Sequence, residues 1–219
     1  MPYSRRDARF VFLLVFLVVY KAALREEDFI LRLGLLSFFT TTQTNTAMTA
    51  ADKYYLKAQS SYGYDVDETL EALEYGLSCD DTHPGLLTLQ GDLYFYQLKQ
   101  FEAAQEQYEL SLFYDASFVR TYYSYIRLLL TVEELKRAER LIKKAITVRG
   151  IDKSRVLHLQ AVLFEKQERY ADAIENLKKA KEYTQSKESI SFYADELQRV
   201  EQKNISAEVS KKQVNIVLV

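Results

Sequence analysis

Large and small residues alternate along the chain in a pattern that fits one face of an α-helix. Residues 170–180, YADAIENLKKA, contain its clearest form, in which Tyr170, Ala173, Leu177 and Ala180 follow at steps of three, four and three. Residues at these steps lie on one side of a helix, and the two alanines let a neighbouring helix approach closely. The pattern therefore predicts a helix that packs along a seam of alternating large and small side chains.

This spacing recurs at a nearly constant interval. The other sets are Phe101, Ala104, Tyr108 and Ser111; Leu135, Ala138, Ile142 and Ala145; and, more loosely, Val66, Thr69, Leu73 and Gly76. Their first residues are separated by 35, 34 and 35 positions. A second amphipathic segment precedes each of the three good sets, and it carries Gly91 and Tyr94, Ile126 and Leu129, or Ala161 and Phe164. Each unit is therefore predicted to be a helical hairpin, and the fixed period is typical of a stacked repeat protein.

A helical hairpin of this period, with these small and large positions, resembles the tetratricopeptide repeat (TPR) family. The resemblance covers residues 48–187, with good units near 84–117, 119–152 and 154–187 and a divergent first unit near 50–83. It implies an all-α fold, a right-handed α-solenoid of about three to four stacked helix-turn-helix units. The alternative is a plain antiparallel helical bundle whose similar spacing arose by chance.

Three departures from the family pattern carry structural expectations. In the first unit, one alignment puts Lys57 at a small position, and a shift of one residue recovers Ala58 but implies a longer turn at residues 63–65. Ile126 is large where a small residue is usual, so the second good unit is expected to be slightly open. No unit closes on proline, since Asp81, Ala116 and Gly150 stand near that position. The turns between units are therefore expected to be irregular.

The segments that flank the repeats have different compositions. Residues 188–203 place Ile190, Tyr193, Leu197 and Val200 at helical spacing and are predicted to form a capping helix over the last unit. Residues 204–219 are interpreted as a C-terminal tail that ends in the apolar run QVNIVLV and docks on the cap or serves as an interaction motif. Residues 1–47 hold an apolar segment and a Thr-rich linker.

The N-terminal apolar run from Phe10 to Tyr20, FVFLLVFLVVY, follows three arginines and has three interpretations. In the first, the run is a membrane anchor that tethers the repeats to a membrane. In the second, it is a spurious extension and the working protein starts at Met48. In the third, it forms a buried or amphipathic helix. A start at Met48 favours a cytoplasmic location, and an anchor favours a membrane-anchored one.

Composition and motifs narrow the functional classes. The chain has 219 residues and a formal net charge of -2, which gives no overall field for attracting nucleic acid, so no nucleic-acid role is expected. The single cysteine, Cys79, is interpreted as a small core residue. Two histidines and one cysteine do not match a zinc site, and no nucleotide-binding or catalytic motif occurs. Residues 80–83, DDTH, are expected to form a turn between units, with Asp and Thr capping the next helix. We therefore predict no catalysis, cofactor or metal.

The family resemblance implies that the first helices of the units line a concave groove. The corresponding positions here are Thr88, Asp92, Phe95 and Tyr96; Arg120, Tyr123, Arg127 and Thr131; and Arg155, His158, Val162 and Lys166. This lining is rich in arginine and aromatic residues, which are frequent in peptide-binding surfaces. The predicted peptide-binding residues are Tyr96, Arg120, Tyr123, Arg127, Arg155 and His158.

These observations favour a non-enzymatic scaffold or adaptor that binds a peptide or helix of a partner protein in the groove. One alternative is a small TPR chaperone for an exported protein, which also binds an extended segment in its groove. A membrane-tethered assembly factor is another, and it requires the N-terminal run to act as an anchor. Association of the chain with itself is possible in each case.

Overall fold

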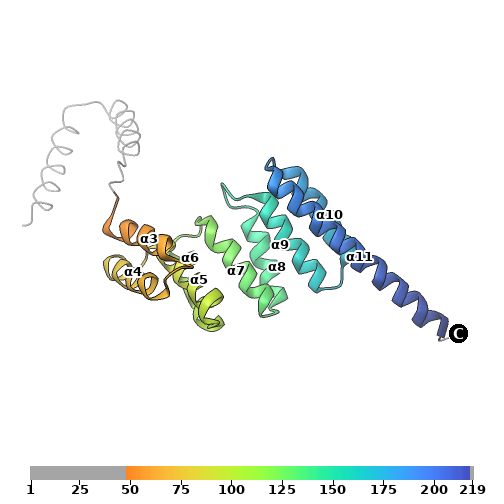
Figure 1. Cartoon of the computed structure of the whole chain (residues 1–219), viewed down its shortest axis with the longest axis horizontal. Helices are drawn as coiled ribbons and strands as arrows, with labels where there is room; N and C mark the ends of the chain where they lie inside the picture. Colours follow the sequence, from red (N-terminus) through yellow and green to blue (C-terminus); the bar gives the residue numbers. More distant parts are fainter. Residues whose placement is uncertain (1–47, 218–219) are drawn as a thin grey trace, which may run out of the picture. The chain divides into compact units, whose positions relative to one another are not determined.

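A computed structural model describes residues 48–217 of the chain, and the described part is one compact unit (Figure 1). The predictions made for the linker and for the apolar run of residues 10–20 lie outside it. Among the described helices, none combines the length and apolar character that crossing a membrane requires.

Helices account for all the regular structure of the described residues, and eight of them follow one another as four antiparallel pairs (Figure 1). The pairs are α3 (Ala50–Ser61) with α4 (Val66–Cys79); α5 (Pro84–Asp92), continued by the π-helical turn η1 (Leu93–Leu98), with α6 (Phe101–Tyr114); α7 (Val119–Thr131) with α8 (Leu135–Ala145); and α9 (Lys153–Lys166) with α10 (Tyr170–Tyr183). A long helix, α11 (Lys187–Val217), follows the last pair. The predicted all-α solenoid of stacked hairpins is confirmed.

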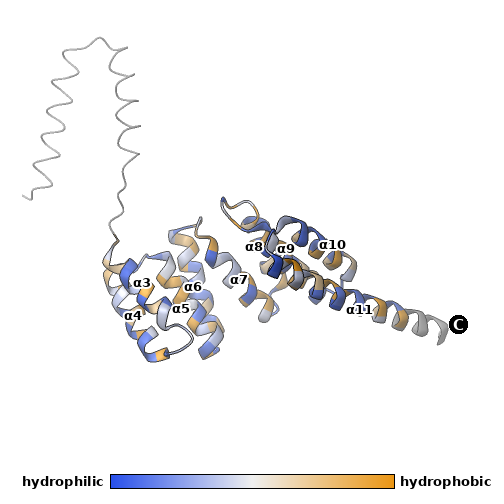
Figure 2. Ribbon diagram, turned by 45° about the horizontal axis from the view of Figure 1, so that its top comes forward, coloured by the Kyte–Doolittle hydropathy of each residue, from blue (hydrophilic) through white to orange (hydrophobic). Residues whose placement is uncertain are grey.

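The seam residues form the core of the stack. In the second helix of each pair, the two small seam positions and the large residue between them are buried, as are Ala173, Leu177 and Ala180 in α10. The first large position is only half-buried in α6, α8 and α10, where it covers the edge of the core. Figure 2 shows the resulting alternation of hydrophobic and hydrophilic bands along the helices. Close packing at the small positions is therefore what lets consecutive units stack.

Each hairpin turn contains one residue in the left-handed backbone region. Gly63 occupies this conformation in the first turn, whereas Lys99, Glu133 and Glu168 occupy it in the next three, with φ of 57–61°. A left-handed residue ends a helix because it redirects the chain while its N–H still bonds back to the last turn. The hairpins thus share one turn mechanism, although glycine supplies it only once.

The structure resolves the register of the first unit. Ala58 is fully buried and Lys57 is exposed, so the alignment on Ala58 is correct. The longer turn that this alignment implies is present at residues 62–65. The expectation from Ile126 is also met, since α7 and α8 pack less closely than the helices of the other pairs.

The connections between units differ in length and in their capping. Residues 80–83 and 115–118 form short turns, whereas residues 146–152 form a longer one that includes Gly150 at φ 82°. At the first of them, the His83 Nδ1 accepts a hydrogen bond from the Leu86 N–H, and Pro84 begins α5. The turn at the DDTH residues is present, but His83 caps α5 instead of the Asp and Thr residues that were expected to do so. Cys79, by contrast, is exposed, because it is the last residue of α4 and lies beyond the seam, so its core interpretation was wrong.

The capping helix packs on the last unit as its apolar spacing predicts. Tyr193 and Val200 are buried against Leu157, Ala161 and Leu177 of α9 and α10. The helix does not end near Lys203 but continues to Val217, because residues 204–217 contain neither Gly nor Pro. Much of the predicted tail is therefore the continuation of α11.

Candidate functional site

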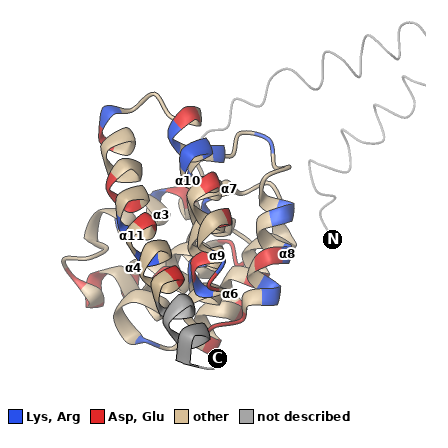
Figure 3. Cartoon of the chain, turned by 90° about the vertical axis from the view of Figure 1, so that its right-hand side faces the viewer, with Lys and Arg blue, Asp and Glu red and all other residues tan. Residues whose placement is uncertain are grey.

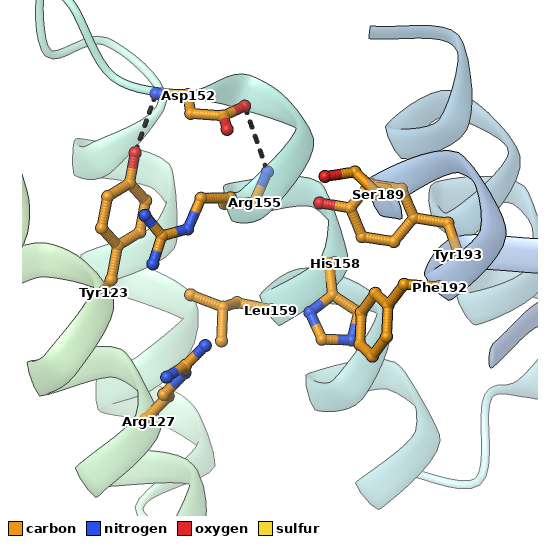
Figure 4. A pocket seen from close by; sticks show the side chains of 9 residues that line it. All are labelled: Tyr123, Arg127, Asp152, Arg155, His158, Leu159, Ser189, Phe192 and Tyr193. Carbon is orange, nitrogen blue, oxygen red and sulfur yellow. Dashed lines mark hydrogen bonds between the residues drawn. The ribbon is translucent and has the colours of Figure 1, made fainter. Parts of the chain in front are cut away.

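Two adjoining cavities lie along α7 and α9 and together contain the predicted peptide-binding residues. The larger, of about 710 Å³, is lined by Tyr62, Asp92, Tyr96, Val119, Arg120, Tyr123, Ser124, Arg127 and Arg155. The smaller, of about 210 Å³, is lined by Tyr123, Arg127, Asp152, Arg155, His158, Leu159, Ser189, Phe192 and Tyr193 (Figure 4). Because three residues line both cavities, we call the two together the groove.

Arg120 is held by contacts within the protein. Its Nη2 donates to Asp92 Oδ2 at 3.1 Å, and its Nη1 donates to the Tyr55 hydroxyl at 3.2 Å. Burial opposes the charge of this guanidinium, but the contacts with Asp92 and Tyr55 together outweigh it, and the pKa of Arg120 is raised. The side chain ties α7 to the preceding unit, so only part of its donor capacity faces the groove.

The other oxygen of Asp92 is also occupied. The Tyr108 hydroxyl donates to Asp92 Oδ1 at 2.9 Å, and the Asp92 side chain is only 6% exposed. Burial, together with the negative charge of Asp92, raises the pKa of Tyr108. Asp92, Tyr108 and Arg120 therefore form one buried network at the floor of the groove, where an unpaired carboxylate would be costly.

Arg155 and Tyr123 form a cation–π pair at the junction of the two cavities. The guanidinium carbon lies 4.1 Å from the centre of the Tyr123 ring (Figure 4). The Tyr123 hydroxyl accepts a hydrogen bond from the Asp152 N–H at 2.8 Å, and the Asp152 carboxylate caps the start of α9. Tyr123 thus fixes the turn before α9, and its ring supports the Arg155 guanidinium.

Arg127 lies one helical turn beyond Tyr123 on α7 and borders both cavities (Figure 4). Its side chain is exposed, and neither it nor the Arg155 guanidinium has an ion pair or hydrogen bond with another described side chain. A guanidinium offers five N–H donors in a planar fork that suits carboxylates. The groove therefore presents two arginines whose donors are not used within the described part of the chain.

His158 closes one end of the groove together with an aromatic pair from α11. Its ring centre lies 5.1 Å from that of Phe192 and 5.7 Å from that of Tyr193. Burial lowers the pKa of His158 despite the nearby Glu196 carboxylate and so favours the neutral imidazole. Phe192 is 47% exposed and offers the apolar contact area at this end.

Two of the wider set of positions that the resemblance places in the groove belong instead to the interior. Thr88 is fully buried, and its hydroxyl forms hydrogen bonds with Ser111 and Thr121 at 3.0 and 2.6 Å. Phe95 belongs to the core, whereas Asp92 is buried but still borders the larger cavity. The predictions for Thr88 and Phe95 were wrong, because both side chains are buried and border neither cavity. Tyr96, in η1, does border the larger cavity.

The sequence pattern missed the contributions of two other elements. Tyr62 follows α3 and borders the larger cavity, while Ser189, Phe192 and Tyr193 of α11 border the smaller one. The sequence does predict a helix here, and Phe192 lies next to its predicted apolar residue Tyr193. The repeat pattern places groove residues only on the first helices of units, so it predicts a capping role for this helix and no contact with the groove.

Comparison with known proteins supports the fold. No family model and no curated protein sequence matches the chain. Among solved structures, PilF of Pseudomonas aeruginosa is 17% identical, with a TM-score of 0.62, and the match covers 73% of this chain and 72% of PilF. MamA from Desulfovibrio magneticus RS-1, residues 41 to the end, is 17% identical, with a TM-score of 0.58 and coverage of 78% and 96%.

A third match is yeast Tom70, at 18% identity and a TM-score of 0.58, over 75% of this chain but only 36% of Tom70. At such identities the likeness establishes the architecture alone. Together with the four stacked hairpins and their seams, it identifies the described part of the chain as a tetratricopeptide-type helical solenoid.

Proposed function

We propose that this protein is a non-enzymatic interaction module that binds a segment of a partner protein in the groove, with carboxylates of the segment facing Arg127 and Arg155. The observation that carries the proposal is a pair of guanidiniums that, among the described residues, have no ion pair or hydrogen bond with another side chain, and that lie beside the exposed rings of Tyr96 and Phe192. Arginine and aromatic residues are the types most enriched in binding hot spots.

The two ends of the groove favour different contacts. Tyr96 is 39% exposed at one end and Phe192 is 47% exposed at the other, so both offer ring surface to an apolar side chain. Between them, Arg127 and Arg155 supply positive charge, whereas the Asp92 carboxylate is buried and neutralised by Arg120. An extended or helical segment with acidic residues between two apolar ones fits this order.

The test selects peptides for the groove and then reverses its charge. Peptides from a random display library that bind the full chain are synthesised, and their Kd is measured by fluorescence anisotropy. We expect the selected peptides to be acidic, and Arg127→Glu with Arg155→Glu to weaken binding at least about tenfold, because like charges then face each other. Circular dichroism checks that the variant is folded.

A matched control makes the same charge change outside the groove, with Lys178→Glu and Lys181→Glu on α10. Both lysines are exposed and border neither cavity. We expect this control to bind the peptides within about threefold of the wild type. If the groove variant also binds as tightly as the wild type, or if no peptide is enriched, the proposal is wrong. Arg120 is left unchanged, because a glutamate there would lie against Asp92 and disturb the fold.

A further inference from the structure

Charge is distributed unequally along the solenoid, although the whole chain is nearly neutral. Residues 48–118 contain 13 Asp and Glu but only three Lys and no Arg, a formal charge of −10. Residues 119–187 contain 16 Lys and Arg against nine Asp and Glu, a formal charge of +7. The first two hairpins are thus acidic and the next two are basic, and a net charge for the whole chain hides this division.

The acidic half exposes a row of carboxylates on α4. Asp67, Glu71 and Glu74 lie at steps of four and three residues, so they share one helical face, and all three are exposed. None has an ion pair within the described residues, whereas the neighbouring Glu68 is paired with Lys57. Tyr75, which is 53% exposed, lies beside this row. The face therefore combines three unneutralised carboxylates with an aromatic ring.

The basic half exposes a complementary row on α8. Lys136, Arg140 and Lys143 have the same steps of four and three residues, and all are exposed. Lys143 is paired with Glu139 at 2.7 Å, but Lys136 and Arg140 have no ion pair within the described part of the chain. In Figure 3, blue bands lie at both ends of α8. The rows on α4 and α8 thus have matching spacing and opposite sign.

The two rows are not used to neutralise each other within one molecule. The two halves are joined by other ion pairs, such as Arg120 with Asp92 and Arg137 with Glu109. These contacts join neighbouring hairpins, whereas α4 and α8 belong to the first and third hairpins. Among the described residues, no ion pair links α4 with α8. Each row therefore remains available to a partner of opposite charge.

We propose that a second copy of this chain is that partner, and that the α4 row of one copy binds the α8 row of another. The chain itself carries both complementary surfaces, each of three charges at the same helical spacing. Tyr75 supplies the aromatic contact, because a guanidinium such as that of Arg140 binds well over a tyrosine ring. This association uses surfaces outside the groove and is independent of peptide binding there.

The test measures the mass of the full chain in solution by sedimentation equilibrium at 50 mM and 500 mM NaCl. We expect association at 50 mM salt, weakened at least about tenfold at 500 mM, because salt screens exposed charges. Lys136→Glu with Arg140→Glu is expected to abolish it, as is Glu71→Lys with Glu74→Lys. An equimolar mixture of these two variants is expected to associate again, since each then carries the surface that the other needs.

The matched control is Asp195→Lys with Glu201→Lys on α11, which changes the net charge as the α4 variant does. Both residues are exposed and have no ion pair within the described residues. This control is expected to associate like the wild type. A mass that stays monomeric at 50 mM salt would overturn the proposal, including the case in which the α8 row binds anionic vesicles or DNA instead. Variants that associate unchanged, or a mixture that stays monomeric, would also overturn it.

Discussion

Gly91 has a packing role that its place inside a helix does not reveal. A Cβ added there would lie 2.6 Å from the Tyr108 ring, which is closer than carbon atoms approach in folded proteins. That ring is fully buried, and its hydroxyl is fixed by the hydrogen bond to Asp92. Tyr108 therefore cannot move aside without breaking the network that also holds Arg120.

We expect Gly91→Ala to destabilise the protein by about 1–3 kcal/mol, because it overpacks this site. The sign of this change in the free energy of unfolding is informative, because replacing glycine by alanine inside a helix ordinarily stabilises a protein by about 1 kcal/mol. Urea denaturation followed by circular dichroism measures the difference. Glu102 is exposed on α6 and has no ion pair within the described residues. Glu102→Ala is therefore the control and should change the stability by less than about 0.5 kcal/mol. An unchanged or raised midpoint for Gly91→Ala would contradict the packing argument.

At the scale of elements, α11 is attached to α9 by an ion cluster as well as by apolar packing. Arg199 donates from Nη1 and Nη2 to the two oxygens of Glu165, each at 2.6 Å, and Lys203 donates to the same carboxylate. Hydrogen bonding from Arg199 outweighs the opposing effect of burial, and with Lys203 it lowers the pKa of Glu165 to about 2. The charged form of Glu165 thus favours the docked cap.

This shift predicts a pH dependence with a definite sign. A carboxyl whose pKa is about 4.5 when unfolded and about 2 when folded stabilises the fold above pH 4.5, and the contribution is lost as the pH falls towards 2. We expect the melting temperature of Glu165→Gln to fall less steeply between pH 5 and pH 3 than that of the wild type. Glu106→Gln, at an exposed position with no ion pair to any described residue, should keep the wild-type slope. Equal slopes for all three proteins would exclude this role.

At the scale of the whole molecule, the repeat leaves its last hairpin with one open face, and α11 covers it. Leu157, Ala161 and Leu177 form one buried cluster with Tyr193 and Val200 of α11, and Leu197 packs against it. Stacked repeats without a cap expose such a face to water. The same helix also supplies Phe192 to the groove, so the cap links stability with the binding surface.

We therefore expect a chain that stops after residue 185 to lose roughly 3–6 kcal/mol of stability, the value of burying Tyr193 and Val200. Urea denaturation measures this loss. A chain that stops after Val209 keeps these contacts and is the control, with a much smaller change expected. If both truncations shift the midpoint equally, the stability depends on the end of α11 rather than on the cap.

The residues that line the groove can be compared with those that the repeat register predicted. All six predicted binding residues border the two cavities, because the period places the first helices of successive units in the same orientation. Their binding role stays a prediction. The register did not distinguish Arg120, which is used in the buried network, from Arg127, which has no ion pair with another described residue. That difference depends on Asp92, 28 positions before Arg120.

The sequence by itself determined the solenoid. Small and large seam residues, such as Ala173 and Leu177, recur every 34–35 positions, and stacking of the repeated hairpins is the simplest way to bury the helix faces that carry them. It also determined the first helices as the site of the groove. Only the tertiary structure decided that Thr88 and Phe95 are internal and that α11 closes the groove. It also decided that, among the described residues, no ion pair joins the charged rows on α4 and α8. Periodicity reports which face of a helix is buried, whereas pairing and exposure depend on contacts between residues far apart in the sequence.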